Sequence, residues 1–289
     1  MLFYIPFTWR LVVLKRPSPL IYGIALTDRC NFRCKGCQVS NTGRPDLTWV
    51  QLCAAMQDAW KRGFREIYFS GGEPMLWHDE RYSIEDGIAE ARRIGFFHIH
   101  IYTNGSFGLK SSADLIWVSI DGLPGTFESR RGDHFHQVER AVRDSEHPKI
   151  AVIYVIDRYT AQGINPFLQW VQDTKFPVIG VMFYFHTPYY GIDDHYLDFN
   201  ERSPIIDRLL DYSHSGMPVI NSTAGLKALK SGNWPRRFPV ASVLDVDGES
   251  VCCRASDEVC PDCGYAACTE LTEFQRMRPS ALVSMLRYW

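Results

Sequence analysis

Short apolar segments alternate with amphipathic segments along most of the chain, and this alternation predicts strands separated by helices. Between the first two apolar segments, Thr48 and Gln51 have the spacing of a helix capping box, and an apolar helical face follows until Gly63. Residues 83–94 repeat the helical pattern. The segments that predict strands are 21–28, 66–69, 98–102, 115–120, 150–156 and 178–185. Six βα units predict an α/β fold, a partial (β/α)6 TIM-like barrel.

The third strand segment alternates strictly between polar and apolar side chains. His98, His100 and Tyr102 fall on one face, and two isoleucines fall on the other. In a barrel whose outer face is covered by helices, the polar face points into the lumen. His100 and Tyr102 are therefore candidate substrate contacts, although neutral histidines inside a barrel also serve as structural residues.

Composition limits the number of domains and the partners. The 289 residues are 46% hydrophobic with a formal charge of −2, which is enough for one large core. We predict an N-terminal apolar and basic segment (1–20), the barrel (21–195) and a short Cys-rich C-terminal extension (196–289). The isoelectric point near 6.5 and the mixed charges lack the basic stripe of a nucleic-acid-binding protein, so no nucleic acid partner is expected.

Residues 1–16 are apolar and aromatic and end in basic residues. Arg10 interrupts this stretch, which is too short to cross a bilayer. It can close the bottom of the barrel as a strand or a helix, or it can make a peripheral membrane contact, as aromatic and basic amphipathic segments do. Both interpretations stay open from the sequence.

Nine cysteines without a secretory signal indicate a reducing cytoplasm, where thiolates are free to bind iron. Cys30, Cys34 and Cys37 follow the first predicted strand with the spacing C-x3-C-x2-C. Three thiolates can hold an oxygen-sensitive [4Fe–4S] cluster and leave one iron open to a ligand, whereas electron carriers use four. Zinc sites need paired Cys or Cys/His elements instead. Cys53 lies in a predicted helix and is interpreted as structural.

A second motif, Ser70-Gly71-Gly72-Glu73-Pro74, follows the second predicted strand. With both motifs, the chain resembles the radical S-adenosylmethionine (radical SAM) superfamily. The resemblance implies that the amino and carboxylate groups of SAM chelate the open iron, and that one electron cleaves SAM to a 5′-deoxyadenosyl radical. It also implies a reducing partner such as flavodoxin or ferredoxin.

The same resemblance implies which residues bind SAM at this second motif. Gly71 and Gly72 let the backbone approach the methionyl group without a Cβ in the way. Glu73, followed by Pro74, offers a carboxylate to the ammonium of SAM.

Three further positions match SAM contacts of the superfamily. Asn104 and Ser119 follow or end the third and fourth strands and are expected to hydrogen-bond SAM, and Arg131 is expected to bind its carboxylate. Gly36 stands where most members carry an aromatic residue that packs against adenine. We therefore expect an empty space beside Gly36.

An aromatic cluster follows the sixth predicted strand, near the open side of the barrel. Tyr184, His186, Tyr189 and Tyr190 can line a substrate pocket with a large apolar area and a few polar tips. Core packing is the alternative role for these side chains.

Five cysteines fall within the 17 residues 252–268. Soft thiolates serve zinc and iron–sulfur clusters alike, so a second [4Fe–4S] cluster, a zinc ion and unligated thiols are the alternatives. Because adjacent cysteines do not easily bind one tetrahedral ion together, Cys253 is the expected ligand rather than Cys252. The other expected ligands are Cys260, Cys263 and Cys268.

Together these features predict an enzyme that cleaves SAM and uses the radical for hydrogen abstraction or adenosyl addition. The aromatic pocket and the apolar N-terminal segment favour a small, lipid-like substrate. The C-terminal sequence CPDCGY and the turn FHTPYYG also resemble, more weakly, the adenosyl-transfer enzymes of hopanoid biosynthesis. The alternatives are a non-catalytic iron–sulfur scaffold, an electron-transfer protein, and a maturase that acts on a peptide or RNA.

Overall fold

One curved sheet forms the centre of the computed structural model, which describes residues 4–16, 18–189 and 191–288. The strand order is β10-β9-β1-β2-β5-β6-β7-β8, and only β10 runs antiparallel to its neighbour. The strands are β1 (Ile21–Thr27), β2 (Glu66–Gly71), β5 (His98–Thr103), β6 (Leu115–Ser119), β7 (Ile150–Ile156), β8 (Val181–Phe185), β9 (Ala241–Asp245) and β10 (Gly248–Val251), with a separate hairpin of β3 (His78–Asp79) and β4 (Tyr82–Ser83). The strands from β1 to β8 in this sheet confirm the predicted partial barrel.

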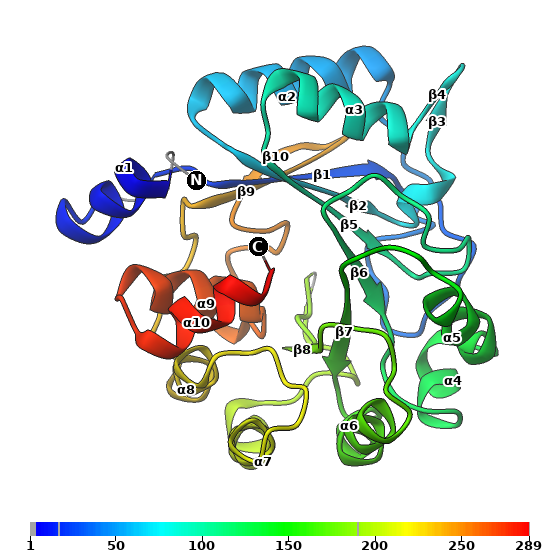
Figure 1. Ribbon diagram of the computed structural model, residues 1–289, viewed down its shortest axis with the longest axis vertical. Coiled ribbons are helices and arrows are strands. Elements are labelled where there is room, and N and C mark those ends of the chain that lie inside the picture. Colours follow the sequence, from blue (N-terminus) through cyan, green and yellow to red (C-terminus); the bar gives the residue numbers. More distant parts are fainter. Residues whose placement is uncertain (1–3, 17, 190, 289) are drawn as a thin grey trace.

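Helices cover the outer face of the sheet (Figure 1). In α2, Thr48 and Gln51 form the predicted capping box, and the helix ends at Gly63 in the left-handed conformation with φ of 106°. The buried Leu52 and Met56 of this helix join the apolar layer between α2, α3 and the sheet. The helices are α1 (Tyr4–Thr8), α2 (Trp49–Arg62), α3 (Ile84–Ile94), α4 (Thr126–Arg131), α5 (Phe135–Arg143), α6 (Ile164–Asp173), α7 (Phe199–His214), α8 (Thr223–Ser231), α9 (Ala266–Gln275) and α10 (Pro279–Tyr288).

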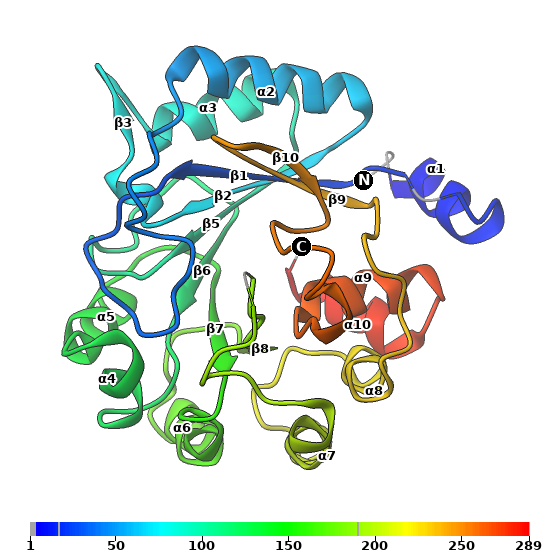
Figure 2. The same ribbon diagram turned by 180° about the vertical axis from the view of Figure 1, so that it is seen from behind.

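The C-terminal part of the chain adds two strands to the barrel sheet. β9 pairs in parallel with β1, with Ile21 opposite Ala241, and β10 folds back on β9. The helices α8, α9 and α10 lie on the open side of the barrel, between β8 and β9 (Figures 1 and 2). The sequence pattern did not predict β9 and β10, because their partner strand lies at the opposite end of the chain.

The N-terminal segment forms α1 and a π-helical turn, Trp9–Val13. Phe7 and Leu11 are buried against residues of α9, α10 and the segment before β9. The segment therefore packs as a helix where the barrel meets its C-terminal part, while Ile5 and Trp9 are 67% and 59% exposed. In the described ranges, no helix has the length and apolar character needed to cross a membrane.

Candidate radical SAM site

The loop between β1 and α2, residues 28–47, carries the three motif cysteines, and we call it the cluster loop. Asn41 fixes its shape, because its Oδ1 accepts a hydrogen bond from Cys30 N at 3.0 Å and its Nδ2 donates to Phe32 O at 3.0 Å. Cys30 and Cys34 are half-buried, and Cys37 is exposed. The loop therefore presents three thiols at the C-terminal ends of the strands, where barrels build their sites.

The glycines of the second motif lie against the cluster loop. A Cβ at Gly71 would lie 2.3 Å from Thr27 O, and a Cβ at Gly72 would lie 2.2 Å from Arg29 O. Gly72 N donates to Thr27 O at 2.7 Å. The missing Cβ at both positions thus lets the end of β2 lie against the start of the cluster loop, and the predicted approach of SAM to these glycines stays a prediction.

Glu73 follows these glycines, and hydrogen bonds hold its carboxylate in place. Its side chain is fully buried, and its carboxylate accepts hydrogen bonds from Thr103 Oγ1 and Asn104 N at 2.7 Å each and from Met75 N at 3.1 Å. Burial raises the pKa of Glu73, against these hydrogen bonds, which lower it. The carboxylate joins the ends of β2 and β5, and its predicted contact with the SAM ammonium stays a prediction. Pro74 is buried and begins the 3-10 turn Pro74–Leu76.

Asn104 likewise faces the cluster loop. Its Nδ2 donates to Asn31 Oδ1 at 2.9 Å and lies 3.7 Å from Cys30 Sγ. Asn104 therefore holds the loop that carries the cysteines, and its predicted hydrogen bond to SAM stays a prediction.

Two buried arginines form an ion-pair network beside Cys34. Arg130 and Arg131 both pair with Asp121 Oδ2, with Nε–Oδ2 distances of 3.2 Å and 2.6 Å, and Arg130 also pairs with Asp157. Arg131 Nη1 lies 3.8 Å from Cys34 Sγ. Burial alone would lower the pKa of Arg131, but the charges of Asp121 and Cys34 raise it above its ordinary value. Arg131 is therefore a permanent cation next to the cluster loop.

His195 fills the space that Gly36 was expected to leave empty. A Cβ at Gly36 would lie 2.8 Å from Cδ2 of the His195 ring, and Gly36 has φ of 72°. His195 Nδ1 lies 2.8 Å from Asp157 Oδ2, which holds the ring in place. The sequence did not indicate His195, because no motif connects it with a glycine that lies far away along the chain.

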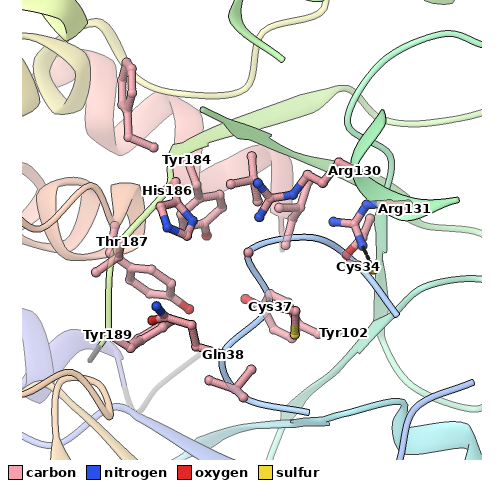
Figure 3. Close-up of a pocket in the computed structure, with 17 residues that line it drawn as sticks. Cys34, Cys37, Gln38, Tyr102, Arg130, Arg131, Tyr184, His186, Thr187 and Tyr189 are labelled. Atoms are coloured by element: carbon pink, nitrogen blue, oxygen red, sulfur yellow. Dashed lines mark hydrogen bonds between the residues drawn. The ribbon is translucent and has the colours of Figure 1, made fainter. Parts of the chain in front are cut away.

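A pocket of about 280 Å³ opens beside the cluster loop (Figure 3). Arg131 and Cys34 lie at one end of it, and Tyr189 lies toward the other. Of the residues predicted from the sequence, those lining the pocket are Cys34, Cys37, Tyr102, Ser119, Arg131, Tyr184, His186 and Tyr189. His100 lies deeper in the barrel, and Tyr190 lies outside the described residues.

Several pocket residues were missed from the sequence. Gln38 directly follows the third motif cysteine, and Tyr265 follows the C-terminal C-x2-C pair, so position next to a metal motif was the available signal. Arg130 and Thr187 carried no comparable signal. His186 Nε2 lies 3.0 Å from Asp193 Oδ2, while burial and the nearby Arg130 charge lower the pKa of His186.

The donor set on the cluster loop suits an iron–sulfur cluster. Burial raises the pKa of the Cys30 thiol to about 11 and also raises that of Cys34. Metal binding deprotonates such thiols, and the Arg131 cation compensates the negative charge that results. The residues present therefore fit the group that the sequence motif predicts.

The five C-terminal cysteines are all buried. Cys252 Sγ and Cys268 Sγ lie 2.9 Å apart. Cys252, which was not the expected ligand, is therefore in contact with Cys268, which was. Arg237 donates to Cys253 O at 2.9 Å, and Arg236 donates to Cys260 O at 2.9 Å. These two cations suit an anionic metal centre.

Sequence comparisons find relatives that match about half of the chain or less. GTP 3′,8-cyclase of Corynebacterium glutamicum (strain R) is 29% identical over 161 residues, which cover 50% of this chain and 38% of the cyclase. Pre-heme d1 synthase of Dinoroseobacter shibae is 28% identical over 127 residues, covering 40% of this chain and 30% of the synthase. The chain thus spans well under half the length of these two relatives.

Solved structures share the fold. Native anSMEcpe with bound AdoMet and Kp18Cys peptide gives a TM-score of 0.63 at 17% identity, over 94% of this chain and 84% of that chain. Streptococcus suis SuiB bound to precursor peptide SuiA gives 0.56 at 14% identity, over 71% and 49%. A family model described as the Radical SAM superfamily matches residues 24–171, the region that carries both motifs. This chain therefore belongs to the radical SAM superfamily.

Proposed function

We propose that the protein cleaves SAM reductively to a 5′-deoxyadenosyl radical, which abstracts hydrogen from, or adds to, a small apolar substrate. Membership of the superfamily implies a [4Fe–4S] cluster and SAM as cofactors. One observation carries the proposal: Cys34 and Cys37 of the cluster loop line the same pocket as Tyr102, Tyr184 and Tyr189. A substrate in this pocket lies next to the place where the radical forms.

The cluster, when bound, supplies the electron that breaks the sulfonium bond of SAM. Arg131 is the proposed partner of the SAM carboxylate, because Asp121 holds it through Nε and its Nη1 points to Cys34. Ser119 lines the same pocket and offers a hydroxyl to SAM. Glu73 is the proposed partner of the SAM ammonium, and Asn104 is a proposed hydrogen-bond partner of SAM. Both also hold the strand ends against the cluster loop.

The pocket walls favour an apolar substrate over a charged one. Ile153, Val155 and Phe185 line the pocket together with its tyrosines. Arg130 is paired with Asp121 and Asp157, and Arg131, which is paired with Asp121, is assigned to the SAM carboxylate, so neither is left for a charged substrate. This supports a lipid-like or isoprenoid molecule, which can use the tyrosine rings and a few hydrogen bonds.

The test is anaerobic reconstitution with iron and sulfide, followed by reduction with flavodoxin or dithionite and measurement of 5′-deoxyadenosine. A variant with alanine at Cys30, Cys34 and Cys37 should form none, whereas the matched control Cys53→Ala, in α2, should match the wild type. If the iron-loaded wild type forms no 5′-deoxyadenosine, the non-catalytic iron–sulfur alternative replaces the enzyme. Products with candidate lipids, peptides and nucleotides then identify the substrate class.

We also propose a second metal centre at the C-terminal cysteines. Cys260, Cys263 and Cys268, with Cys253 or Cys252, are buried beside Arg236 and Arg237, and Tyr189 packs between this group and the pocket. Metal analysis on the variant that lacks the three cluster-loop cysteines tests this. About four irons per chain support a second cluster, one zinc supports a structural zinc site, and neither metal contradicts the proposal.

The exposed face of the N-terminal helix suits an anionic lipid surface, which we propose as a peripheral contact. Ile5, Trp9 and Val13 are exposed with a spacing of four residues, and Arg10 and Lys15 lie beside them, also exposed. The wild type should sediment with vesicles that contain phosphatidylserine and not with pure phosphatidylcholine vesicles. Equal recovery of Trp9→Ser and the wild type would contradict this contact.

A further inference from the structure

A second cavity, of about 110 Å³, lies deeper in the barrel, and we call it the lumen cavity. Tyr102, Tyr184 and Tyr265 line both this cavity and the pocket beside the cluster loop. From these tyrosines the lumen cavity reaches Ile21 and Glu66, at the starts of β1 and β2. It is therefore placed to take the part of a substrate that extends away from the reacting carbon.

The walls of the lumen cavity are mostly apolar and aromatic, including Trp117, Met182, Leu271 and Met285. A cavity of similar size, roughly 150 Å³, with apolar walls binds benzene in another protein. The lumen cavity thus has room for a short apolar chain of a few carbons.

His100 lines this cavity, and both of its ring nitrogens already have hydrogen-bond partners. Trp117 Nε1 is a donor only and lies 3.1 Å from His100 Nδ1, so the ring carries its proton on Nε2, which lies 2.7 Å from His98 Nδ1. Glu66, His98 and His100 place ligand atoms within 4.8 Å of one another. Because His100 Nε2 carries a proton in this network, we read the group as a chain of hydrogen bonds and not as a metal site.

Glu270 of α9 is different, because one of its oxygens has no hydrogen-bond partner among the described residues. Its Oε1 accepts from Ser222 N at 2.9 Å, at the start of α8. Its Oε2 is buried and has no partner in the described part of the chain, although the side chain lines the lumen cavity and the residue is only 5% exposed. Holding α8 requires Oε1 alone, and a buried acceptor without a donor is unfavourable. The free oxygen is therefore available to a ligand in the cavity.

We propose that the lumen cavity binds the far end of the substrate, an apolar arm whose terminal hydroxyl donates a hydrogen bond to Glu270 Oε2. This rests on the proposed function, which places the reacting carbon in the pocket on the other side of the three tyrosines. A hydroxyl suits this carboxyl better than an anion would.

The C-terminal metal centre borders the lumen cavity but is not expected to fill it. Cys252 and Cys268 line it, whereas Cys253, Cys260 and Cys263 are not among the described residues that do. The cavity extends away from the cysteines toward β2 and β5. A ligand test on the reconstituted protein includes the metal and so checks this directly.

The experiment measures binding of 1-butanol, n-pentane and n-butylammonium to the reconstituted protein by ligand-observed saturation-transfer NMR. In the wild type, 1-butanol should bind more tightly than the other two probes. Glu270→Leu should weaken 1-butanol binding about fivefold, the size of one hydrogen bond, without weakening n-pentane binding. Glu270→Gln, which keeps a polar amide, should bind 1-butanol within about twofold of the wild type, because it still offers one hydrogen bond.

Two variants show where the alcohol binds. Ala267→Phe, at the cavity wall, should abolish 1-butanol binding. This variant tests the location of the binding site even if Glu270→Leu does not fold. Glu273→Gln changes a neighbouring buried carboxyl that pairs with Arg276 outside the cavity, and it should bind 1-butanol like the wild type.

The proposal is overturned if n-pentane or n-butylammonium binds as tightly as 1-butanol, if Glu270→Leu or Ala267→Phe leaves 1-butanol binding unchanged, or if metal reconstitution removes binding. Formation of 5′-deoxyadenosine, measured without any alcohol, decides the reaction separately. Failure of the lumen proposal is thus distinguishable from failure of the proposed function.

Discussion

Replacing Asp121 with asparagine tests the buried ion-pair network beside the cluster loop. The Asp121 carboxylate is fully buried and pairs with Nε of both Arg130 and Arg131. Asparagine keeps the shape and the acceptor for Val155 N, but it leaves two guanidinium groups with one remaining carboxylate, that of Asp157. Removing one partner of a buried ion pair costs about 3–5 kcal/mol, and we expect about 3 kcal/mol because Asp157 still compensates Arg130.

Urea unfolding followed by tryptophan fluorescence measures this loss, on protein samples of matched iron content. With a dependence of about 3 kcal/mol per molar urea, the midpoint should fall by about 1 M. Asp207→Asn is the control, because the Asp207–Lys230 pair is exposed and worth at most about 1 kcal/mol. If Asp121→Asn lowers the midpoint no more than the control does, the two arginines do not depend on Asp121.

Three further substitutions test the roles of Gly72, Asp157 and Arg131. Gly72→Ala should lower the iron bound per chain after reconstitution, because its Cβ would lie 2.2 Å from Arg29 O. The control Gly87→Ala in α3, whose Cβ would have its nearest contact at 3.4 Å, should bind iron like the wild type. Equal iron in both variants would reject the packing role of Gly72. Burial would raise the pKa of Asp157, but Arg130 and His195 lower it overall, so this carboxylate stabilises the fold above about pH 4 and that stability is lost as the pH falls through the lowered pKa. The difference in free energy of unfolding between the wild type and Asp157→Asn should therefore shrink in acid, and a constant difference from pH 7 to pH 3 would argue against it. Arg131→Ala should weaken SAM binding about 30-fold, because it removes one charge-assisted hydrogen bond worth about 2 kcal/mol. Equilibrium dialysis of the reconstituted protein measures this affinity. An unchanged affinity would reject Arg131 as the carboxylate partner.

The sequence predicted those elements whose signals are local. The capping box of Thr48 and Gln51 and the alternation in residues 98–102 depend on neighbours a few residues apart, and the structure has both elements. β9 was not predicted, because a segment of five residues has too weak a local pattern, and what makes it a strand is its pairing with β1.

The same limit applied to the site. The motif glycines were recognised, but their contact with Thr27 O and Arg29 O could not be, because it depends on how β2 lies beside β1. Nor could the ring of His195 be placed against Gly36. The residue types in the motifs predict the chemistry of this site. Packing between segments that are distant in the sequence determines which side chains face the pocket.

The pairing of β1 with β9 has a consequence for synthesis on the ribosome. β1 is made early, but one of its two edges stays unpaired until residues 241–244 have been translated and have left the exit tunnel. During this time a strand of mostly buried residues exposes free backbone donors and acceptors, which other nascent chains can pair with. Truncated forms that end before β9 should therefore aggregate, and the chain should need protection by chaperones until residues 241–244 have emerged.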